Sequence, residues 1–247
     1  MTTIDDYPLT TADPVDRAVM LQRWEDVAFV HWPFAPAVVQ ERLPSGLTVD
    51  TFDDRAWVGL VAFHMRGIRL PFLPPVPYLG SFPETNVRTY VRGPDGQPGV
   101  WFDSLDITRL IPVLVAQASY RLPYRWSDMR IDRTGDMLTY TATTRWPGPA
   151  GMTSRIAIRP GDSIGVAGDL ERFLTARWGL YSRFGRSVSY APVDHPEWSL
   201  RRADLTDLDD HLMSAAGYPA PQGDPLVHYA SGVAVRIGLP RRIETDA

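Results

Sequence analysis

Short runs of β-branched and aromatic residues, in which apolar and polar positions alternate, recur along most of the chain. Side chains two positions apart on a strand point to the same side, so this alternation predicts strands with a buried face. The clearest runs predict strands at residues 27–32, 56–65, 86–92, 100–105, 137–145 and 226–237. Glycine-containing turn signals predict two hairpins, one at residues 93–99 (GPDGQPG) and one at residues 134–136.

Helical patterns are few and short. Four helices are expected, at residues 35–43, 109–120, 169–176 and 205–216. Pro36 suits the first turn of the first helix, the second is apolar on nearly every side and should be buried, and Asp169 is expected as the N-cap of the third. Residues 70–80 are proline-rich and predict an extended loop covering a cavity.

Composition supports a strand-rich protein and excludes several chemistries. Only six of the 29 acidic residues are Glu, and there is no Lys, so the usual fillers of exposed helix faces are scarce. Without Lys the protein has no amine for a Schiff base, a pyridoxal phosphate anchor or a Walker A loop. Without Cys it has no disulfide, thiolate nucleophile or sulfur-ligated metal.

The overall charge and the apolar runs bear on partners and location. The net charge of −4, with no basic run, argues against nucleic acid as a partner. No apolar run is long enough for a membrane helix, and no export signal is evident, so we expect a cytoplasmic protein without a membrane partner. No linker or repeat divides the chain. We therefore expect a flexible N-terminal tail, residues 1–16, and a single domain, residues 17–247.

Common catalytic and metal-binding motifs are absent. The sequence has no G-x-S-x-G, H-E-x-x-H or G-x-G-x-x-G, and no two histidines are spaced i, i+4. The candidate chemistry is instead a polar strand face, because Glu84, Asn86, Arg88 and Tyr90 alternate within an otherwise apolar segment. This face either lines an internal cavity or points to solvent with a Glu–Arg pair. Asp106, a little further on, is favoured as a cap for the helix that follows.

Several strings identify the chain as similar to a bacterial family of unknown function. EDVAFVHWPF, LPSGLTVDTFDDRAWVGLVAFHMRG, FPETNVRTYVRGPDGQPGVWFDSLD, ASYRLPY, LTARWGLY and DHPEW resemble, in this order, the YqjF-like family over about residues 20–240. That family is placed in the acetoacetate decarboxylase-like superfamily. The resemblance implies a β-rich α+β fold: a closed, bent antiparallel β-barrel with a cavity and a few short flanking helices.

The similarity to acetoacetate decarboxylase itself implies a loss of its chemistry. Its Gly-Tyr-Pro-Lys-Lys string is nearest here to residues 121–125, which puts Tyr124 in place of the Schiff-base lysine and Arg125 in place of its neighbour. Trp32 takes the place of an arginine of the decarboxylase, and Glu84 resembles a retained superfamily carboxylate. The imine mechanism therefore cannot operate, and shared fold does not carry activity.

The expected site is a lysine-independent cavity for a small anionic or oxygenated organic molecule. Glu84 or His31 is expected as the acid or base, with Tyr124 and Arg88 stabilising an oxyanion. The further ligand-binding candidates are Asn86, Arg125, Trp32 and Asp103. No metal or cofactor is expected, and a homo-oligomer is left open. A non-Schiff-base lyase, hydratase or isomerase acting on a carboxylate or keto acid fits this site. A non-catalytic binding protein and a purely structural polar network are the alternatives.

Overall fold

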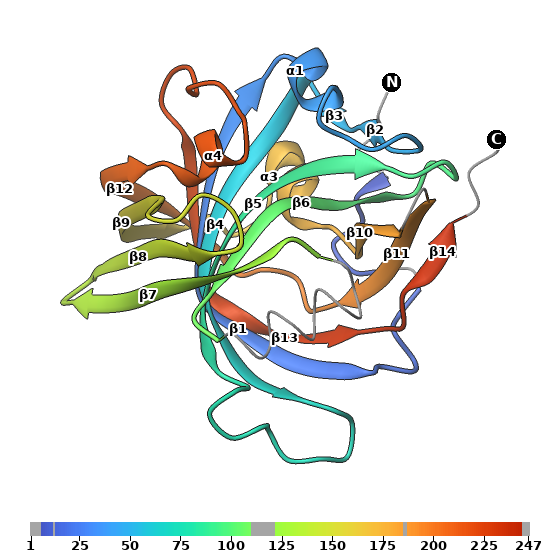
Figure 1. Ribbon diagram of the computed structural model, residues 1–247, viewed down its shortest axis with the longest axis horizontal. Coiled ribbons are helices and arrows are strands. Elements are labelled where there is room, and N and C mark those ends of the chain that lie inside the picture. The colour runs from blue at the N-terminus through green and yellow to red at the C-terminus, as the bar shows by residue number, and fades with distance from the viewer. Residues whose placement is uncertain (1–5, 12, 110–121, 185–186, 244–247) are drawn as a thin grey trace.

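Strands make up most of the computed structural model, which describes residues 6–11, 13–109, 122–184 and 187–243 (Figure 1). The strands are β1 (Met20–Phe34), β2 (Thr48–Val49), β3 (Thr51–Phe52), β4 (Arg55–Arg69), β5 (Phe82–Arg92), β6 (Pro98–Ile107), β7 (Tyr124–Thr134), β8 (Met137–Trp146), β9 (Thr153–Ser163), β10 (Gly179–Phe184), β11 (Ser187–Asp194), β12 (Leu200–Asp210), β13 (Leu226–Ile237) and β14 (Arg241–Ile243). The helices are α1 (Pro36–Gln40), α3 (Asp169–Thr175) and α4 (Leu212–Ala215).

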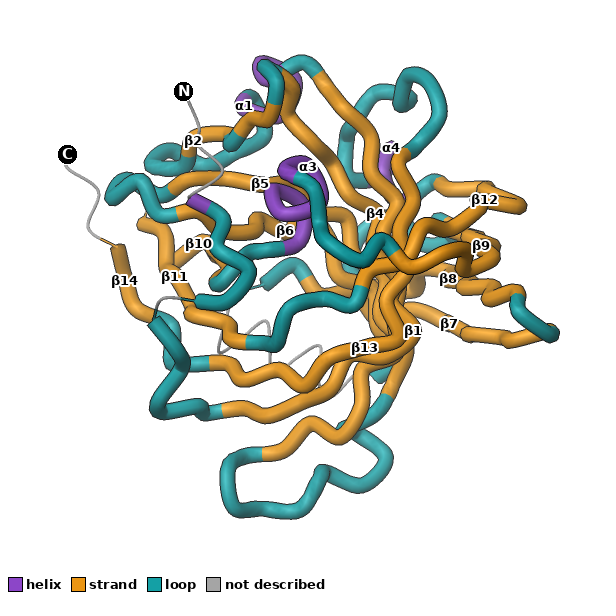
Figure 2. Tube along the Cα trace, turned by 180° about the vertical axis from the view of Figure 1, so that it is seen from behind, coloured by secondary structure: helices purple, strands orange, loops and turns teal. Residues whose placement is uncertain are grey.

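The strand pairings close into a barrel. From β6 the order runs through β7, β8, β9, β12, β13, β1, β4 and β5, and β5 pairs again with β6. A second ring shares β13, β1, β4, β5 and β6 and closes through β10 and β11. The two rings are visible side by side in Figure 2. The predicted closed barrel is confirmed, with the difference that β6 pairs in parallel with both β7 and β10, so the barrel is mixed.

The central strands β1 and β4 are buried on both faces, because the two rings share them. Along the second half of β1, Val27 and Phe29 pack into the cluster inside the β10–β11 ring, whereas Ala28 and Val30 pack into the cluster on the opposite face. Alternate side chains of one strand thus enter two different cores. Whether a residue faces the cavity therefore depends on its place in the alternation of side chains along its strand.

The expected strands are all present and most are longer than expected. Both hairpins are confirmed: β5 and β6 pair in antiparallel fashion across residues 93–99, and β7 and β8 pair across residues 134–136. Gly96 (φ 77°) and Gly135 (φ 62°) adopt the left-handed conformation that these turns need. Residues 70–80 contain neither helix nor strand, as expected from their prolines.

The helix predictions have mixed outcomes. The first and third helices are confirmed as α1 and α3, although Gly168, and not Asp169, is the N-cap of α3. The helix expected at residues 205–216 is wrong, because residues 200–210 form β12 and only 212–215 are helical. A bulge between Leu205 and Asp207 turns Leu205 and Leu208 toward the same core, which imitates helical spacing. The predicted helix at residues 109–120 lies almost entirely outside the described residues.

The segment expected to be a flexible tail contributes to the core. Tyr7 and Val15 are buried, and the Tyr7 hydroxyl donates a hydrogen bond of 2.7 Å to Asp50 Oδ2. The domain division at residue 16 stays a prediction. No helix in the described parts of the chain is long and apolar enough to cross a bilayer, and the compartment stays a prediction as well.

Candidate functional site

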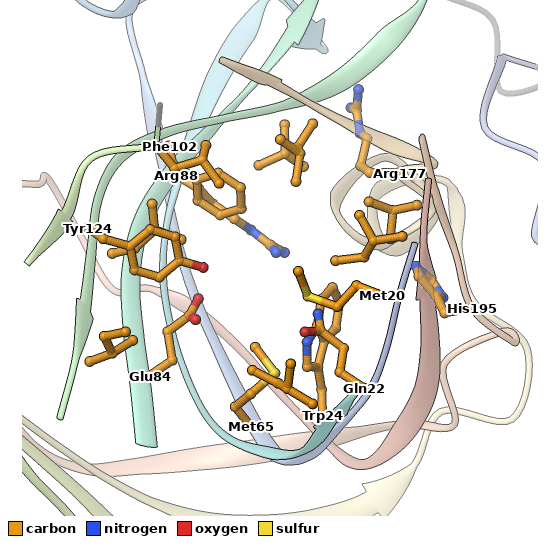
Figure 3. A pocket seen from close by; sticks show the side chains of 18 of the residues that line it. Met20, Gln22, Trp24, Met65, Glu84, Arg88, Phe102, Tyr124, Arg177 and His195 are labelled. Atoms are coloured by element: carbon orange, nitrogen blue, oxygen red, sulfur yellow. The ribbon is translucent and has the colours of Figure 1, made fainter. Parts of the chain in front are cut away.

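A cavity of about 360 Å³ lies inside the ring formed by β13, β1, β4, β5, β6, β10 and β11 (Figure 3). Most of its lining side chains are apolar. Its polar side chains include Gln22, Glu84, Arg88, Tyr124, Thr175, Arg177 and His195. A largely apolar cavity with a few converging polar groups is the usual form of a small-molecule site.

Glu84 is a buried carboxyl group in the cavity wall, with 3% of the residue exposed. Asn86 Nδ2 donates a hydrogen bond of 3.1 Å to Glu84 Oε1, and Oε2 has no hydrogen-bond partner among the described residues. Burial raises the pKa of Glu84 to about 7, against the opposing effects of Asn86 and the Arg88 charge. At neutral pH the group is therefore divided between acid and carboxylate, which suits it to transfer a proton in either direction.

Arg88 brings a guanidinium group into the middle of the cavity, as Figure 3 shows. Its Nη2 donates to Tyr90 Oη at 3.3 Å and to the Leu174 carbonyl at 3.5 Å, while Nε is buried without a partner. The group lies over the rings of Phe29 and Tyr90. Within the described chain no carboxylate forms an ion pair with Arg88. A partly buried cation with spare donors is suited to bind a ligand carboxylate.

Tyr124 begins β7 and lines the cavity beside Glu84. The parallel pairing of β6 and β7 places it opposite Leu105, another lining residue. Its hydroxyl group is directed toward the Glu84 carboxyl group in Figure 3. The structure thus brings together Glu84, Arg88 and Tyr124, the three residues that the sequence predicts to act in one site.

His31 lies behind this site and not in its wall. It is fully buried, and its Nε2 is 2.6 Å from Tyr90 Oη. Arg88 can only donate to the Tyr90 oxygen, so the Tyr90 proton points to His31 and Nε2 accepts it. Burial lowers the pKa of His31, with Arg88 and His228 acting in the same direction, so the ring is neutral. The expected role of His31 as a base that touches the ligand does not fit this position. His31 instead fixes the Tyr90 hydroxyl group, which accepts a hydrogen bond from Arg88.

Four of the expected ligand-binding residues do not line the cavity, and three of them lie on the far side of their strands. Trp32 packs into the cluster on the opposite face of β1. Asp103 accepts a hydrogen bond of 2.8 Å from Tyr218 and lies 3.9 Å from Arg42 Nε. Arg125 follows Tyr124 directly and is not among the lining residues. Asp103 and Arg125 directly follow the lining residues Phe102 and Tyr124, and Trp32 follows His31, which lies on the same side of β1 as Phe29. Successive side chains of a strand point to opposite sides, so each of the three points the other way.

Asn86 and Asp106 also differ from their expected roles. Asn86 does not line the cavity and acts through its hydrogen bond to Glu84. Asp106 lies within β6 and accepts hydrogen bonds from Ser127 (2.6 Å) and Thr144 (2.8 Å), so the interpretation of it as a helix cap is wrong. Neither Asp103 nor Asp106 of β6 lines the cavity.

Several lining residues were missed by the sequence analysis. Gln22 and Trp24 face the cavity from β1, and the Trp24 Nε1 group is buried without a partner among the described residues. The alternation of Met20, Gln22 and Trp24 was the available signal. His195 lies against the rings of Trp24, Trp178 and Trp198. Its Nδ1 is 2.8 Å from the Pro196 carbonyl, which can only accept, so Nε2 carries no proton while the ring is neutral.

Burial lowers the pKa of His195 to about 4, so the ring stays neutral over the physiological range. Arg177, the other cation of the wall, is ion-paired with Asp50 at 2.7 Å and is stacked on Tyr7 and Phe173. Its charge is therefore paired with a carboxylate, in contrast to that of Arg88, although Arg177 Nη2 is also buried without a hydrogen-bond partner among the described residues. No group of three or more His, Asp or Glu side chains that could hold a metal ion occurs in the described ranges.

The fold belongs to a known class. An acetoacetate decarboxylase from Legionella pneumophila superposes with a TM-score of 0.64 at 12% identity, over 99% of this chain and 96% of that one. The enduracididine biosynthesis enzyme MppR, complexed with pyruvate, gives 0.63 at 13% identity over 91% and 90%. An acetoacetate decarboxylase-like enzyme from Sphingomonas wittichii gives 0.62 at 14% over 93% and 94%. The protein therefore has an acetoacetate decarboxylase-like barrel.

Its sequence places it more narrowly. Residues 21–234 match the DUF2071 family, described as an uncharacterized conserved protein. The chain is also 34% identical over 214 residues to the uncharacterized protein YqjF of Bacillus subtilis, covering 86% of this chain and 87% of that protein. The chain belongs to the DUF2071 family, and the resemblance drawn from its sequence strings is confirmed.

Proposed function

We propose that the protein binds a small organic carboxylate, such as a keto acid, in its barrel cavity and transfers a proton on it without a Schiff base. The observation that carries this proposal is that one cavity holds both Arg88, a guanidinium with no ion-pair partner and a buried free Nε among the described residues, and Glu84, a buried carboxyl group of pKa about 7. An Arg fork binds a carboxylate through two parallel donors. A group with a pKa near the working pH is the efficient proton-transfer agent.

The three polar groups have distinct roles in this proposal. Arg88 holds the ligand carboxylate and orients the adjacent carbonyl group. Glu84, as carboxylate, removes a proton from the carbon next to that carbonyl to give an enolate and then returns a proton to a carbon of this enolate, so the overall reaction is an isomerisation or exchange with balanced protons. Tyr124 donates a hydrogen bond to the oxygen on which negative charge develops. Asn86 keeps the Glu84 carboxyl group oriented through its bond to Oε1.

The comparisons support the ligand class and not the decarboxylase chemistry. The fold relative MppR is complexed with pyruvate, a 2-oxo acid. The imine route of acetoacetate decarboxylase needs a lysine, and this chain has none. The second candidate function is a binding protein without turnover, and the spare donors of Arg88 favour it equally, because they attract a carboxylate whether or not Glu84 acts.

Measuring binding and proton exchange separately tests the proposal. Calorimetric titration with 2-oxo acids gives Kd, and NMR in D₂O follows loss of the proton next to the carbonyl. Arg88→Met is expected to weaken binding at least about tenfold, because it removes the cation that the ligand charge needs. Glu84→Gln is expected to keep Kd within about threefold and to slow exchange by about a hundredfold or more.

The matched control is Arg155→Met, which removes an exposed surface arginine paired with Asp207, and it should change neither quantity. Binding with no enzyme-dependent exchange in the native protein assigns the function of a binding protein. An absence of binding by any 2-oxo acid, or equal binding by Arg88→Met, refutes the proposal.

A further inference from the structure

The cavity is larger than a ligand that contacts only its polar groups would fill. Its 360 Å³ corresponds to roughly a dozen water volumes. Figure 3 shows Glu84 and Tyr124 at one side, the Arg88 guanidinium reaching the middle, and Met20, Trp24 and His195 across from Glu84 and Tyr124. A three-carbon keto acid bound at Arg88 would leave much of the cavity unfilled. A ligand that uses the whole cavity extends well beyond the reacting atoms.

The side away from Glu84 and Arg88 is an apolar surface, which we call the apolar half. It is formed by Met20, Trp24, Met65, Val193, Trp198 and Ile237. All six belong to, or pack against, one hydrophobic cluster. The polar groups on this side are Gln22, His195 and Arg177, and the charge of Arg177 is already paired with Asp50. Two methionines and two tryptophans supply an adaptable surface for alkyl or aryl groups, and burying such groups there is favourable.

The proline-rich loop, residues 70–80, continues the apolar half at its edge. Val76 and Leu79 line the cavity, while Leu70, Phe72 and Tyr78 of the same loop are exposed. Hydrogen bonds from Val76 N to Ile68 O and from Ile68 N to Gly80 O, both 2.9 Å, fix the loop to the end of β4. The loop adds apolar wall and no charge, because residues 70–80 contain no charged side chain.

We propose that the ligand is an amphiphilic carboxylic acid, with its carboxylate at Arg88 and an alkyl or aryl body in the apolar half. This inference rests on the proposed function, because Arg88 must hold the carboxylate. It narrows the ligand class from any small carboxylate to acids with a body of about four or more carbons beyond the reacting centre. The cavity is therefore expected to favour larger acids over acids of the size of pyruvate.

A homologous series of saturated 2-oxo acids, from pyruvate to 2-oxooctanoate, with phenylpyruvate as the aryl member, tests this directly. Kd measured by calorimetry is expected to fall about three- to fourfold for each added methylene until the cavity is full. Val193→Phe places a ring in the apolar half. It is expected to remove the gain for the longer acids while leaving the Kd of pyruvate unchanged. Ile68→Phe, at the loop edge, serves the same purpose if Val193→Phe does not fold.

Val166→Phe is the matched control, since Val166 is 83% exposed and outside the cavity, and it should leave the whole series unchanged. The same Kd for every chain length would overturn the inference and leave the proposed function intact. Tighter binding of long acids that Arg88→Met does not weaken would refute the proposed function and this inference with it, because the carboxylate would then not be recognised.

Discussion

Glu84 lies on a strand face that the barrel closes off from water. Among the described residues, Asn86 donates a hydrogen bond to one of its two carboxyl oxygens, and the other has no partner. The Glu84 carboxylate therefore loses its hydrogen bonds to water and regains only some of them from the protein. Arg88 offsets part of this cost through its charge, yet the pKa of Glu84 still rises to about 7. A full ion pair between the two would have removed both the proton-transfer group and the free cation.

The raised pKa of Glu84 predicts a specific pH dependence of stability. A folded pKa above the unfolded value of 4.5 means that the native state binds the extra proton. Its contribution to stability is therefore full below about pH 4.5 and is lost as pH rises through about 7. Glu84→Gln removes this dependence, so it should gain stability relative to native protein between pH 5 and pH 8, by up to about 3 kcal/mol.

Urea denaturation of both proteins at pH 5 and pH 8 measures this difference. The exposed Glu41→Gln serves as control and should track the native protein at both values. A Glu84→Gln difference that is the same at pH 5 and pH 8 would show that Glu84 titrates normally.

At the scale of elements, bulges decide which side chains reach the cavity. In β1, Met20, Gln22 and Trp24 face inward, and an irregularity between Glu25 and Ala28 in the pairing with β4 shifts the phase. In β6, Asp103 is the residue skipped between the Arg88–Phe102 and Val87–Ser104 pairs. The inward residues therefore change from Val100 and Phe102 to Leu105 and Ile107.

These bulges explain how far the sequence could predict the site. Strands and hairpins follow from local alternation and turn residues, and the shared face of Glu84 and Arg88 follows from spacing alone. Trp32 and Asp103 could not be placed, because both faces of their strands are buried and a one-residue bulge exchanges those faces. Leu205 and Leu208 were assigned to a helix for the same reason.

The close pairing of β1 and β4 gives a second prediction. Gly59 lies opposite His31, and a Cβ built at Gly59 would lie 2.6 Å from His31 Nε2. Gly59→Ala must displace the ring that accepts the Tyr90 proton, and we expect a loss of about 1–3 kcal/mol of unfolding free energy. In a His31→Ala background the same substitution should cost much less, because the obstacle is gone.

A double-mutant cycle by urea denaturation measures that coupling. Additive effects of Gly59→Ala and His31→Ala would contradict the contact. The cycle also tests the role of His31 as a support, since Gly59→Ala should weaken ligand binding as well when Tyr90 no longer fixes Arg88.

At the scale of the whole molecule, a buried cluster of two ion pairs ties distant segments to the wall of the cavity at Arg177. Asp50, between β2 and β3, pairs with Arg177 after α3 at 2.7 Å and with Arg92 of β5 at 3.0 Å. Tyr7 completes the cluster through its bond to Asp50. Burial raises the pKa of Asp50, but Arg177 and the donated hydrogen bonds outweigh it, so the pKa is lowered. The pair therefore stabilises the fold above the ordinary carboxyl pKa and is lost as pH falls.

The N-terminal segment is consequently expected to contribute to stability, although its sequence predicts a flexible tail. Tyr7→Phe removes the hydrogen bond to Asp50 and should cost about 1 kcal/mol of unfolding free energy. Tyr7→Ala also removes the ring packed on Phe173, at a centroid distance of 5.3 Å, and should cost about 3–5 kcal/mol. Deletion of residues 1–10 should cost at least as much as Tyr7→Ala, whereas Thr10→Ala, at an exposed position, should cost nothing measurable.

Because Arg177 lines the cavity and Asp50 holds it, loss of Tyr7 should also weaken ligand binding measured by calorimetry. A deletion variant as stable as the native chain would show that Tyr7 packs without stabilising, and that α3 and the Asp50–Arg177 pair hold this part of the cavity wall without it.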